Sequence, residues 1–218
     1  MANKEPKVKV QNLTKRFGDL LVLDNLNFEV EEGEFLCIVG PTGCGKTTFL
    51  NSLTRLYEPT AGDILVNGIP VNPKKQNISY IFQEYSSFPW LTVEQNIRFG
   101  LEIKKTPKAE ADANVEEMLD IVGLTKFRNY YPSQLSISML QRVAIARAFA
   151  TKPELLLMDE PYGQLDIDLR FKLEDELIKL WKKTGTTVLF ITHNIEEAVY
   201  LSQKIMVLTN KPTSVKTV

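Results

Sequence analysis

One short stretch of the chain has the residue types and spacing of a phosphate-binding loop. The pattern G-x-x-x-x-G-K-[ST] is matched without a gap by Gly40-Pro41-Thr42-Gly43-Cys44-Gly45-Lys46-Thr47. Glycines in such a loop let backbone N–H groups turn inward onto phosphate oxygens, and the following helix N-terminus adds positive potential. Lys46 would reach the β- and γ-phosphates, and the Thr47 hydroxyl would bind Mg²⁺. A glycine-rich turn without a ligand is the weaker alternative, because an apolar strand precedes the loop and an amphipathic helix follows it.

Two acidic residues stand at the end of another apolar segment. Asp159 and Glu160 directly follow Leu155–Met158. Because a buried parallel strand points its carboxyl end at the ligand crevice, both side chains are expected to face a bound nucleotide. Asp159 suits the Mg²⁺ shell, and Glu160 suits a general base that orients and deprotonates an attacking water. A solvated Asp-Glu-Pro turn is the alternative, which the phosphate loop upstream makes the weaker one.

These side chains need strands and helices to hold them in place. Apolar runs bounded by turn residues predict strands at Val8–Leu13, Leu26–Val30, Phe35–Val39, Ile64–Val66, Ile78–Phe82, Leu155–Met158, Thr187–Ile191 and Ile205–Leu208. Helical spacing predicts helices at Lys46–Tyr57, within residues 94–150 (including Gln141–Ala150) and through Leu169–Leu180. Apolar runs without alternation suit strands buried on both faces of a parallel sheet. The sequence therefore predicts an α/β nucleotide-binding core with a helical subdomain inserted in its middle.

Composition excludes several other classes of protein. The 218 residues carry 26 Lys and Arg against 27 Asp and Glu, so there is no basic excess of the kind typical of nucleic-acid-binding proteins. Apolar runs such as Phe35–Val39 are far shorter than the roughly 18 residues of a membrane span, and residues 1–7 lack the apolar core of a secretory signal. The chain is therefore expected to be soluble and cytosolic. Cys37 and Cys44 are too few for a disulfide framework, and a single histidine, His193, cannot build a multi-histidine zinc site.

Taken in order along the chain, these motifs resemble the ATP-binding subunit of an ABC transporter. The resemblance extends from about residue 7 to the end of the sequence. It implies a P-loop NTPase core of RecA-like type with an N-terminal antiparallel β subdomain and an inserted helical subdomain. The corresponding division is 1–85 for the first part of the core, 86–151 for the helical signature subdomain, and 152–218 for the second part of the core. The resemblance also implies an ATPase with ATP and Mg²⁺ as cofactors.

The family's functional roles transfer to matching positions. Phe17 resembles the aromatic residue that stacks on adenine, although a core phenylalanine is the alternative, and His193 resembles the switch histidine on the γ-phosphate. Gln83 resembles the glutamine that approaches Mg²⁺, and Asp166 lies in the loop through which paired subunits communicate. The implied catalytic residues are Glu160, His193 and Gln83, and the implied metal ligands are Thr47, Gln83 and Asp159. The implied nucleotide contacts are Phe17, Gly40, Pro41, Thr42, Gly43, Cys44, Gly45, Lys46, Thr47, Thr48, Ser136, Ser138 and Asp166.

A second resemblance concerns the branch of the family. The segment Phe88–Ile97, together with Asp159–Gly163, is similar to the nitrate, sulfonate and taurine importers. This implies separate membrane permease subunits, an extracytoplasmic substrate-binding protein and a second nucleotide-binding subunit, with the chain at the cytoplasmic face of the membrane and no nucleic-acid partner. Tyr85, Phe88 and Trp90 either receive a helix from the membrane subunit or pack inside the helical subdomain.

One segment departs from the family pattern. The hallmark Leu-Ser-Gly-Gly-Gln, which closes the ATP site of the opposite subunit, reads Leu135-Ser136-Ile137-Ser138-Met139 in this chain. Isoleucine restricts the dihedral angles and close approach that glycine permits. Ser138 and Gln141 also form a capping-box pattern that would move the helix start by two residues. Two outcomes stay open. Either the backbone geometry of this segment is kept and hydrolysis is near normal, or the chain is a nucleotide-regulated dimerising subunit with poor hydrolysis.

Overall fold

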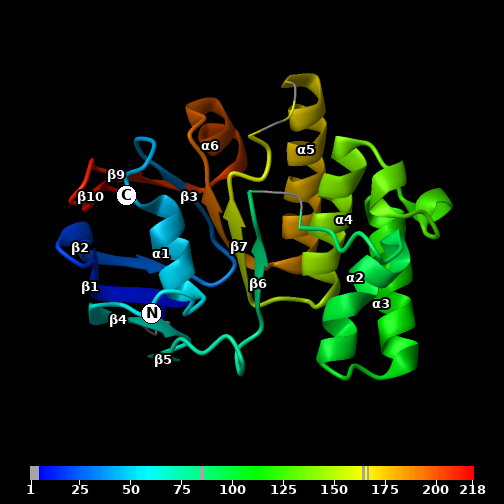
Figure 1. Ribbon diagram of the computed structural model, residues 1–218, viewed down its shortest axis with the longest axis horizontal. Helices are drawn as coiled ribbons and strands as arrows, with labels where there is room; N and C mark the ends of the chain where they lie inside the picture. The colour runs from blue at the N-terminus through cyan, green and yellow to red at the C-terminus, as the bar shows by residue number, and fades with distance from the viewer. Residues whose placement is uncertain (1–4, 84–85, 164, 166) are drawn as a thin grey trace.

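The computed structural model describes residues 5–83, 86–163, 165 and 167–218. Two sheets dominate it (Figure 1). A six-stranded sheet has the order β10-β9-β3-β8-β7-β6 and a four-stranded sheet has the order β2-β1-β4-β5. The strands of the larger sheet are β3 (Phe35–Val39), β6 (Ile78–Ile81), β7 (Leu155–Asp159), β8 (Thr187–Ile191), β9 (Lys204–Leu208) and β10 (Val215–Thr217). Those of the smaller sheet are β1 (Val8–Phe17), β2 (Leu20–Val30), β4 (Ala61–Val66) and β5 (Ile69–Pro70).

The larger sheet has the parallel pairing that its apolar runs predict. β3 pairs in parallel with β8 and β9, and β7 pairs in parallel with β6 and β8, whereas β10 is an antiparallel edge strand. Every residue of β7 and β8 is buried. Within β3, Phe35 and Cys37 pack into the core on one face, and Leu36 and Ile38 pack into the core on the other. Burial on both faces explains why these strands are apolar without alternation.

One helix lies between the two sheets (Figure 1). Helix α1 (Lys46–Leu53) follows β3, and its Phe49, Leu50 and Leu53 are fully buried. They pack against Val8 and Val30 of the smaller sheet and against one face of the larger sheet. The start of α1 is therefore fixed from both sides, and the loop that precedes it is held at the carboxyl edge of the larger sheet.

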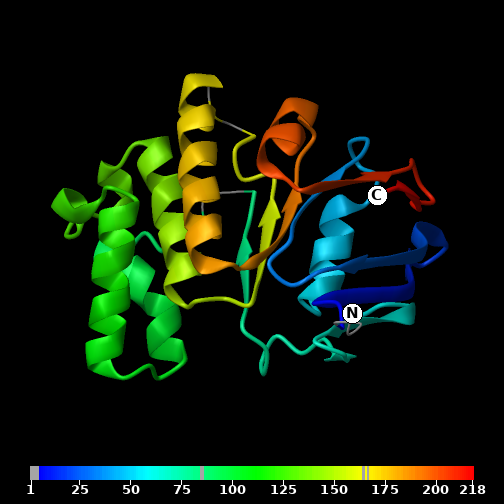
Figure 2. The same cartoon turned by 180° about the vertical axis from the view of Figure 1, so that it is seen from behind.

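The remaining helices cover the opposite face of the larger sheet (Figures 1 and 2). Helices α2 (Val93–Ile103), α3 (Lys108–Ile121) and α4 (Ile137–Ala150) pack together beside it, with short 3₁₀ turns at Thr125–Phe127 and Pro132–Gln134. Helices α5 (Ile167–Thr184) and α6 (Ile195–Leu201) complete this layer.

None of these helices, nor any other in the described ranges, is both long and apolar enough to cross a membrane. The P-loop NTPase fold with an antiparallel β subdomain is confirmed; the boundaries near residues 86 and 151 stay a prediction.

Several expected element ends are wrong. β1 continues to Phe17 and β2 begins at Leu20, so the two strands pair along a hairpin whose turn contains Gly18 at φ 56°. The additional residues of β1 and β2 include polar, exposed side chains, so apolar runs alone predict shorter strands. Helix α1 ends at Leu53 rather than Tyr57, because Arg55 adopts a left-handed φ of 58° and leaves Tyr57 exposed.

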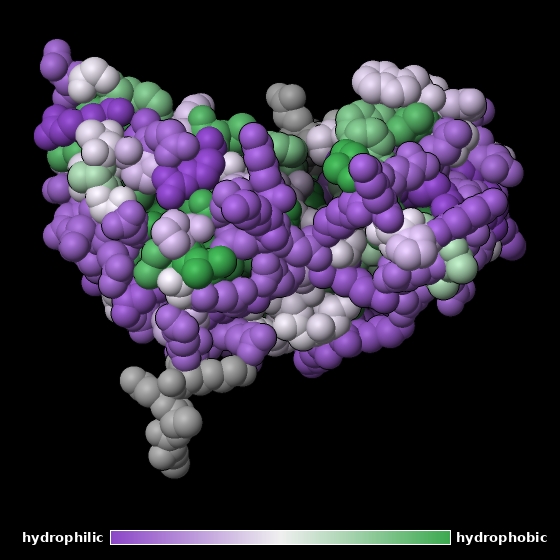
Figure 3. Space-filling model, turned by 90° about the horizontal axis from the view of Figure 1, so that it is seen from below, coloured by the Kyte–Doolittle hydropathy of each residue, from purple (hydrophilic) through white to green (hydrophobic). Residues whose placement is uncertain are grey.

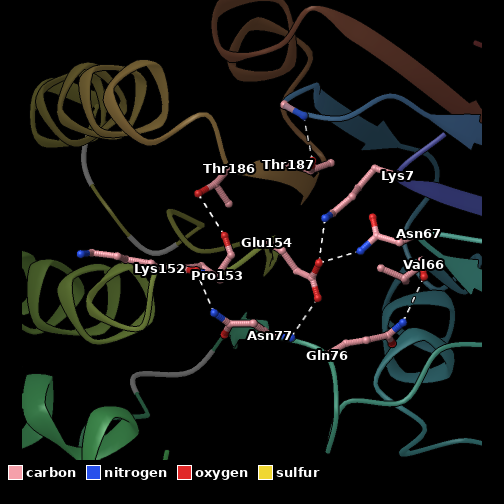
Figure 4. A network of polar contacts seen from close by, with 11 residues as sticks. Lys7, Val66, Asn67, Gln76, Asn77, Lys152, Pro153, Glu154, Thr186 and Thr187 are labelled. Carbon is pink, nitrogen blue, oxygen red and sulfur yellow. Dashed lines mark hydrogen bonds and ion pairs between the residues drawn. The ribbon is translucent and has the colours of Figure 1, made fainter. Parts of the chain in front are cut away.

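A polar network joins the smaller sheet to the beginning of β7 (Figure 4). The Glu154 carboxylate accepts hydrogen bonds from Lys7 Nζ at 2.8 Å, Asn67 Nδ2 at 2.8 Å and the Asn77 backbone N–H at 3.0 Å. The Asn77 side chain donates in turn to the carbonyl oxygens of Thr151 and Lys152. Figure 3 shows that the surface seen from below is mostly hydrophilic, with hydrophobic residues in separate patches. The network therefore adds polar contacts beside the apolar core that Val8 and Val66 of the smaller sheet share with Leu155 of β7.

Candidate active site

The phosphate-binding loop leaves β3 and ends at the first turn of α1. Gly45 is the N-cap of α1 with φ 119°, and Gly43 has φ 73°, values that L-residues rarely adopt. A β-carbon on Gly45 would come within 2.9 Å of Val22 Cγ1, so the position has no room for a side chain either. The Cys44 backbone N–H donates to the Pro41 carbonyl and closes the loop at 3.2 Å. The loop therefore has the conformation that a backbone cradle for phosphate requires.

Lys46 is buried inside this loop. Its Nζ donates to the carbonyl oxygens of Gly40 at 2.9 Å and Pro41 at 3.2 Å, and only 6% of the residue is exposed. The same Nζ lies 3.9 Å from Glu160 Oε1. The positive charge is thus held at the centre of the loop, where a phosphate group would add the counter-charge that two carbonyl oxygens do not supply.

Glu160 and His193 meet across the carboxyl ends of β7 and β8. His193 Nδ1 lies 2.9 Å from Glu160 Oε2, and the Glu160 backbone has a left-handed φ of 46°. A non-glycine residue in that region is uncommon and costs free energy that the surrounding structure must supply. The Glu160 backbone N–H donates to the Ile191 carbonyl at 2.9 Å, and the Glu160 carboxylate lies on the side of the phosphate loop, 3.9 Å from Lys46 Nζ.

Asp159 is the buried member of the acidic pair. It is 3% exposed, and the Tyr80 hydroxyl donates to its Oδ2 at 3.3 Å. Burial raises the pKa of Asp159, while hydrogen bonds from the Thr47 and Tyr80 hydroxyls act in the opposite direction. Tyr80 comes from β6, the neighbour of β7, and nothing in the sequence marks it other than its place in a predicted strand.

A cavity of about 480 Å³ brings the predicted residues together. Its walls come from the phosphate loop and the ends of three strands, and the lining residues are Thr42, Gly43, Gly45, Lys46, Thr47, Thr48, Gln83, Glu160, His193 and Lys211. A neighbouring cavity of about 470 Å³ shares Thr47 and Gln83 with the first one and adds Asp159. Gln83 therefore lines both the cavity beside the phosphate loop and the one that contains Asp159, and its role toward Mg²⁺ stays a prediction. Lys211 was not predicted, and it lies in the segment between β9 and β10, which no motif marks.

The Mg²⁺ prediction can be tested against this donor set. Among the described residues no group of three His, Cys, Asp or Glu side chains could hold a metal ion. Mg²⁺ in nucleotide sites needs less, since it is bound by one or two carboxylates, a hydroxyl and the phosphate oxygens. A buried carboxylate of Asp159 hydrogen-bonded to the Thr47 hydroxyl supplies that minimum. The residues present fit the ion.

Phe17 lies at an exposed aromatic cluster rather than in the core. It is 43% exposed and makes an edge contact with Tyr57, with ring centroids 5.3 Å apart. Lys15 Nζ lies 4.8 Å from the centre of the Phe17 ring. The alternative of a core phenylalanine is therefore wrong. Neither Tyr57 nor Lys15 was predicted to accompany it.

Two sequence predictions concern residues away from this cavity. Ser136 is the N-cap of α4, its hydroxyl accepts from the Met139 backbone N–H at 3.4 Å, and it lies 3.0 Å from the Ser138 hydroxyl. The predicted shift of the helix start to Ser138 is wrong, because Ser136 already caps the first turn. Neither serine lines the cavity around Lys46. Asp166 lies outside the described residues.

The aromatic residues after Gln83 divide between the two alternatives. Phe88 packs inside the helical layer, with its ring 4.4 Å from that of Phe99 and 5.1 Å from the Arg147 guanidinium. Trp90 is 70% exposed. Tyr85 lies outside the described residues. Phe88 is therefore half-buried against the helices, and Trp90 is available at the surface.

Comparison with known proteins identifies the class to which this geometry belongs. Residues 23–163 match the family model described as ABC transporter. The chain belongs to the ABC transporter family. It is 47% identical to an ABC transporter ATP-binding protein of Methanocaldococcus jannaschii over 96% of its length and 80% of that protein. It is 43% identical to the nitrate import ATP-binding protein of a Synechocystis strain over 91% of its length and 75% of that protein.

Other relatives and solved structures agree with this assignment. The aliphatic sulfonates import ATP-binding protein of Bacillus cereus is 42% identical over 91% of this chain and 78% of that protein. The cbiO1 structure from Clostridium perfringens, part of an ABC transporter complex, has a TM-score of 0.88 at 26% identity over 98% of this chain and 88% of that one. A dimeric ATP-binding cassette bound to ADP and phosphate has a TM-score of 0.82 at 33% identity over 96% of this chain and 97% of that one. This ATP-binding cassette is therefore an ABC-type ATPase subunit.

Proposed function

We propose that this cassette hydrolyses ATP with Mg²⁺ to drive import of a small anion such as nitrate, a sulfonate or taurine through separate membrane subunits. The observation that carries the ATPase chemistry is the convergence of Lys46, Glu160 and His193 at one cavity beside the strained phosphate loop. The similarity to nitrate and sulfonate import proteins supports the substrate class.

Each residue of the cavity has a distinct task in this proposal. Lys46 and the loop N–H groups would bind the β- and γ-phosphates, and Phe17 would stack on the adenine ring. Thr47, Gln83 and Asp159 would hold Mg²⁺, which supplies positive charge against the phosphate oxygens when bound. Glu160 would accept the proton of the attacking water.

His193 has a task in the same reaction. Its Nδ1 contacts Glu160, so its ring can orient that carboxylate, and the other ring nitrogen would contact the γ-phosphate. An imidazole that holds the base in place serves the orienting role found in other catalytic pairs. Because His193 is more than half exposed, at 57% of its side chain, a bound phosphate can reach it.

The proposed assembly has two cassettes at the cytoplasmic face of the membrane, with permease subunits and an extracytoplasmic substrate-binding protein. Dimeric cassette structures and the transporter complex that contains cbiO1 support the first two partners. The exposed ring of Trp90, beside the half-buried Phe88, offers an aromatic contact for a helix of the membrane subunit. Tyr and Trp side chains are enriched at such protein–protein contacts.

A second candidate is a nucleotide-regulated dimerising subunit with poor hydrolysis. The observation that favours it is Ile137, which stands half exposed, at 50%, in the first turn of α4. In the proposed dimer this turn would face the partner's ATP, and the isoleucine side chain would hold the backbone N–H groups of the turn away from the phosphate. The N-cap at Ser136 favours the first candidate, because the backbone of the turn is already that of a helix start.

The decisive experiment measures substrate uptake and ATP hydrolysis together. Proteoliposomes that contain the cassette with its membrane subunits would be loaded with Mg²⁺ and ATP. The substrate-binding protein would be added outside, and uptake of nitrate, an alkanesulfonate and taurine would be compared. Uptake of one of these anions that stops when Mg²⁺ is removed would support the import proposal. ATP hydrolysis with no uptake of any of them would overturn the substrate class and leave the ATPase chemistry in place. ATP-dependent dimerisation with hydrolysis near background would favour the second candidate.

A further inference from the structure

Two acidic side chains are buried where α5 meets α6. Glu174 of α5 is 0% exposed and Glu197 of α6 is 6% exposed. Their carboxyl groups contact each other. Burial of two carboxylates side by side is costly, because each loses hydration and each repels the other.

The surrounding side chains do not supply the donors that two ionised carboxylates would need. Within the described ranges, neither oxygen of Glu174 has a hydrogen-bond partner, and neither does Glu197 Oε1, when both groups are counted as acceptors only. Arg170 Nε lies 3.5 Å from Glu174 Oε1 but makes no hydrogen bond in the same set of residues. A proton on one of the two acids makes that acid a donor, so the contact between the Glu174 and Glu197 carboxyl groups becomes a hydrogen bond.

We propose that Glu174 is a protonated acid that donates to the Glu197 carboxylate, and that this shared proton positions the loop carrying His193. Glu174 is therefore a positioning residue, since it touches neither the nucleotide cavity nor the reacting atoms. The role of the loop in hydrolysis rests on the function proposed above for His193. The positioning itself rests on the contacts within this chain.

The hydrogen bonds that connect Glu197 to the loop are continuous. Glu197 accepts from the Thr192 hydroxyl, and that hydroxyl accepts from the Asn194 backbone N–H at 2.9 Å. Asn194 Oδ1 accepts from the Glu197 backbone N–H at 3.1 Å and caps α6. The residues on both sides of His193 are thus tied to one carboxylate. A change in the charge or position of Glu197 moves the loop.

The electrostatics of the site place the proton on Glu174. Burial, then the neighbouring Glu197, raise the pKa of Glu174 to about 7. Burial also raises the pKa of Glu197, but the hydrogen bonds from Thr192 and Glu174 act against this. The other charged or titratable groups that act on the pair are Cys37 of β3, Tyr162 after β7, His193 after β8, Arg170, Asp175 and Glu176 of α5, and Tyr200 of α6.

The sign of the pH dependence follows from the raised pKa. The loop around His193 is called closed when it has the hydrogen bonds described above and open when they are broken. In the closed state the pKa of Glu174 is about 7, and in the open state it takes the ordinary value of 4.5. Between pH 4.5 and about 7 the closed state therefore binds a proton that the open state does not bind. The contribution of Glu174 to the closed state is therefore complete below pH 4.5 and is lost as the pH rises to about 7. Within that window the closed-to-open ratio falls by at most about tenfold per pH unit, the limit for one proton.

Hydrogen exchange across residues 192–197 tests this directly in the nucleotide-free chain. Exchange at pH 5, 6, 7 and 7.5, corrected for the intrinsic pH dependence of amide exchange, reports the opening equilibrium of the loop. The wild-type protection is expected to fall several-fold per pH unit up to pH 7 and then level off. The Glu174→Gln variant keeps a donor to Glu197 but has no proton to lose, so its protection should stay constant.

A second variant and a control make the outcome unambiguous. Glu197→Gln removes the carboxylate that accepts the proton and leaves burial as the main cause of the raised Glu174 pKa, so its protection should depend less steeply on pH than that of the wild type, even if Glu174→Gln does not fold. Glu117→Gln alters a surface acid paired with Lys183 and should keep the wild-type profile. Wild-type protection that does not change with pH, or a glutamine variant that keeps the wild-type slope, would overturn the proposal. If protection depends on pH as expected but the cassette does not hydrolyse ATP, the proposed function is refuted and the positioning role of Glu174 is not.

Discussion

Replacement of Glu160 by glutamine separates nucleotide binding from hydrolysis. The amide has the size of the carboxylate and can keep a hydrogen bond to His193, whose Nδ1 lies 2.9 Å from Oε2. The amide cannot accept a proton from the attacking water, so the change removes the general-base function assigned to Glu160. It also removes the counter-charge 3.9 Å from Lys46 Nζ, in a pair where the Glu160 side chain is 19% exposed. We expect ATP to bind at least as tightly, because the phosphate no longer competes with a carboxylate for Lys46.

The size of the effect follows from the role assigned to Glu160. A positioned general base contributes about 10²–10⁴ in rate, which corresponds to about 2.7–5.4 kcal/mol of barrier at 1.36 kcal/mol per decade. The Mg²⁺-ATPase rate of the variant should therefore fall at least about a hundredfold.

The assay compares steady-state phosphate release with nucleotide-dependent dimerisation in the same preparation. The Glu160→Gln protein with ATP and Mg²⁺ should form a stable dimer by light scattering, whereas the wild type should dimerise only transiently. The Glu117→Gln variant, altered at an exposed acid paired with Lys183, serves as the matched control with the parental rate. Hydrolysis by Glu160→Gln at the parental rate would refute the assignment of the base.

Three further predictions follow from the structure. Lys46→Ala should abolish binding of a fluorescent ATP analogue, and an unchanged Kd would contradict the phosphate-loop geometry. The double variant Ile137→Gly with Ser138→Gly should raise the ATPase rate of the assembled transporter by tenfold or more, about 1.4 kcal/mol of barrier, whereas equal rates would show that the α4 backbone alone makes the contact. Glu154→Ala should lower the free energy of unfolding at pH 7 by about 1.5–3 kcal/mol, because it leaves Lys7, 6% exposed, without its partner. Burial acts to raise the pKa of Glu154, but the hydrogen bonds from Lys7 and other donors outweigh it and lower the pKa below its usual 4.5. The difference in unfolding free energy between wild type and variant should therefore persist above pH 4.5 and disappear as the pH falls further. A difference that stays constant down to pH 3 would contradict this prediction.

The phosphate loop and the acidic strand end could be predicted because their signals are local. The glycine spacing of residues 40–45 imposes the loop conformation within a few residues, and the fully buried β7 and β8 leave an unbroken apolar run in the sequence. Once these strands are parallel neighbours, Asp159 and His193 must lie at the same edge of the sheet. No detail of side-chain packing was needed for that step.

Features that depend on distant segments could not be predicted in this way. Tyr80 reaches Asp159 because β6 pairs with β7, and Lys211 reaches the cavity because the segment after β9 passes the phosphate loop. Nothing in the sequence singles out Glu174, because the apolar stripe of α5 is carried by Leu173 and Leu177. Its burial depends on α6, which packs on the same part of α5. No periodicity in one helix can show that a neighbouring helix brings a second acid to it.

The surface around Ser136 determines how the proposed dimer would work. Each chain would supply a complete set of phosphate-binding residues to one ATP and the first turn of α4 to the other. If the partner is a second copy, both sites meet the same Ile137 and are slowed equally. If the partner is a different cassette with glycines in this turn, the site built on Lys46 and Glu160 of this chain is restored, while the other stays slow. Single-site mutants of such a pair distinguish these cases: loss of Glu160 should remove most of the hydrolysis, and loss of the partner's base should remove little. Equal losses would show that Ile137 does not hinder the contact.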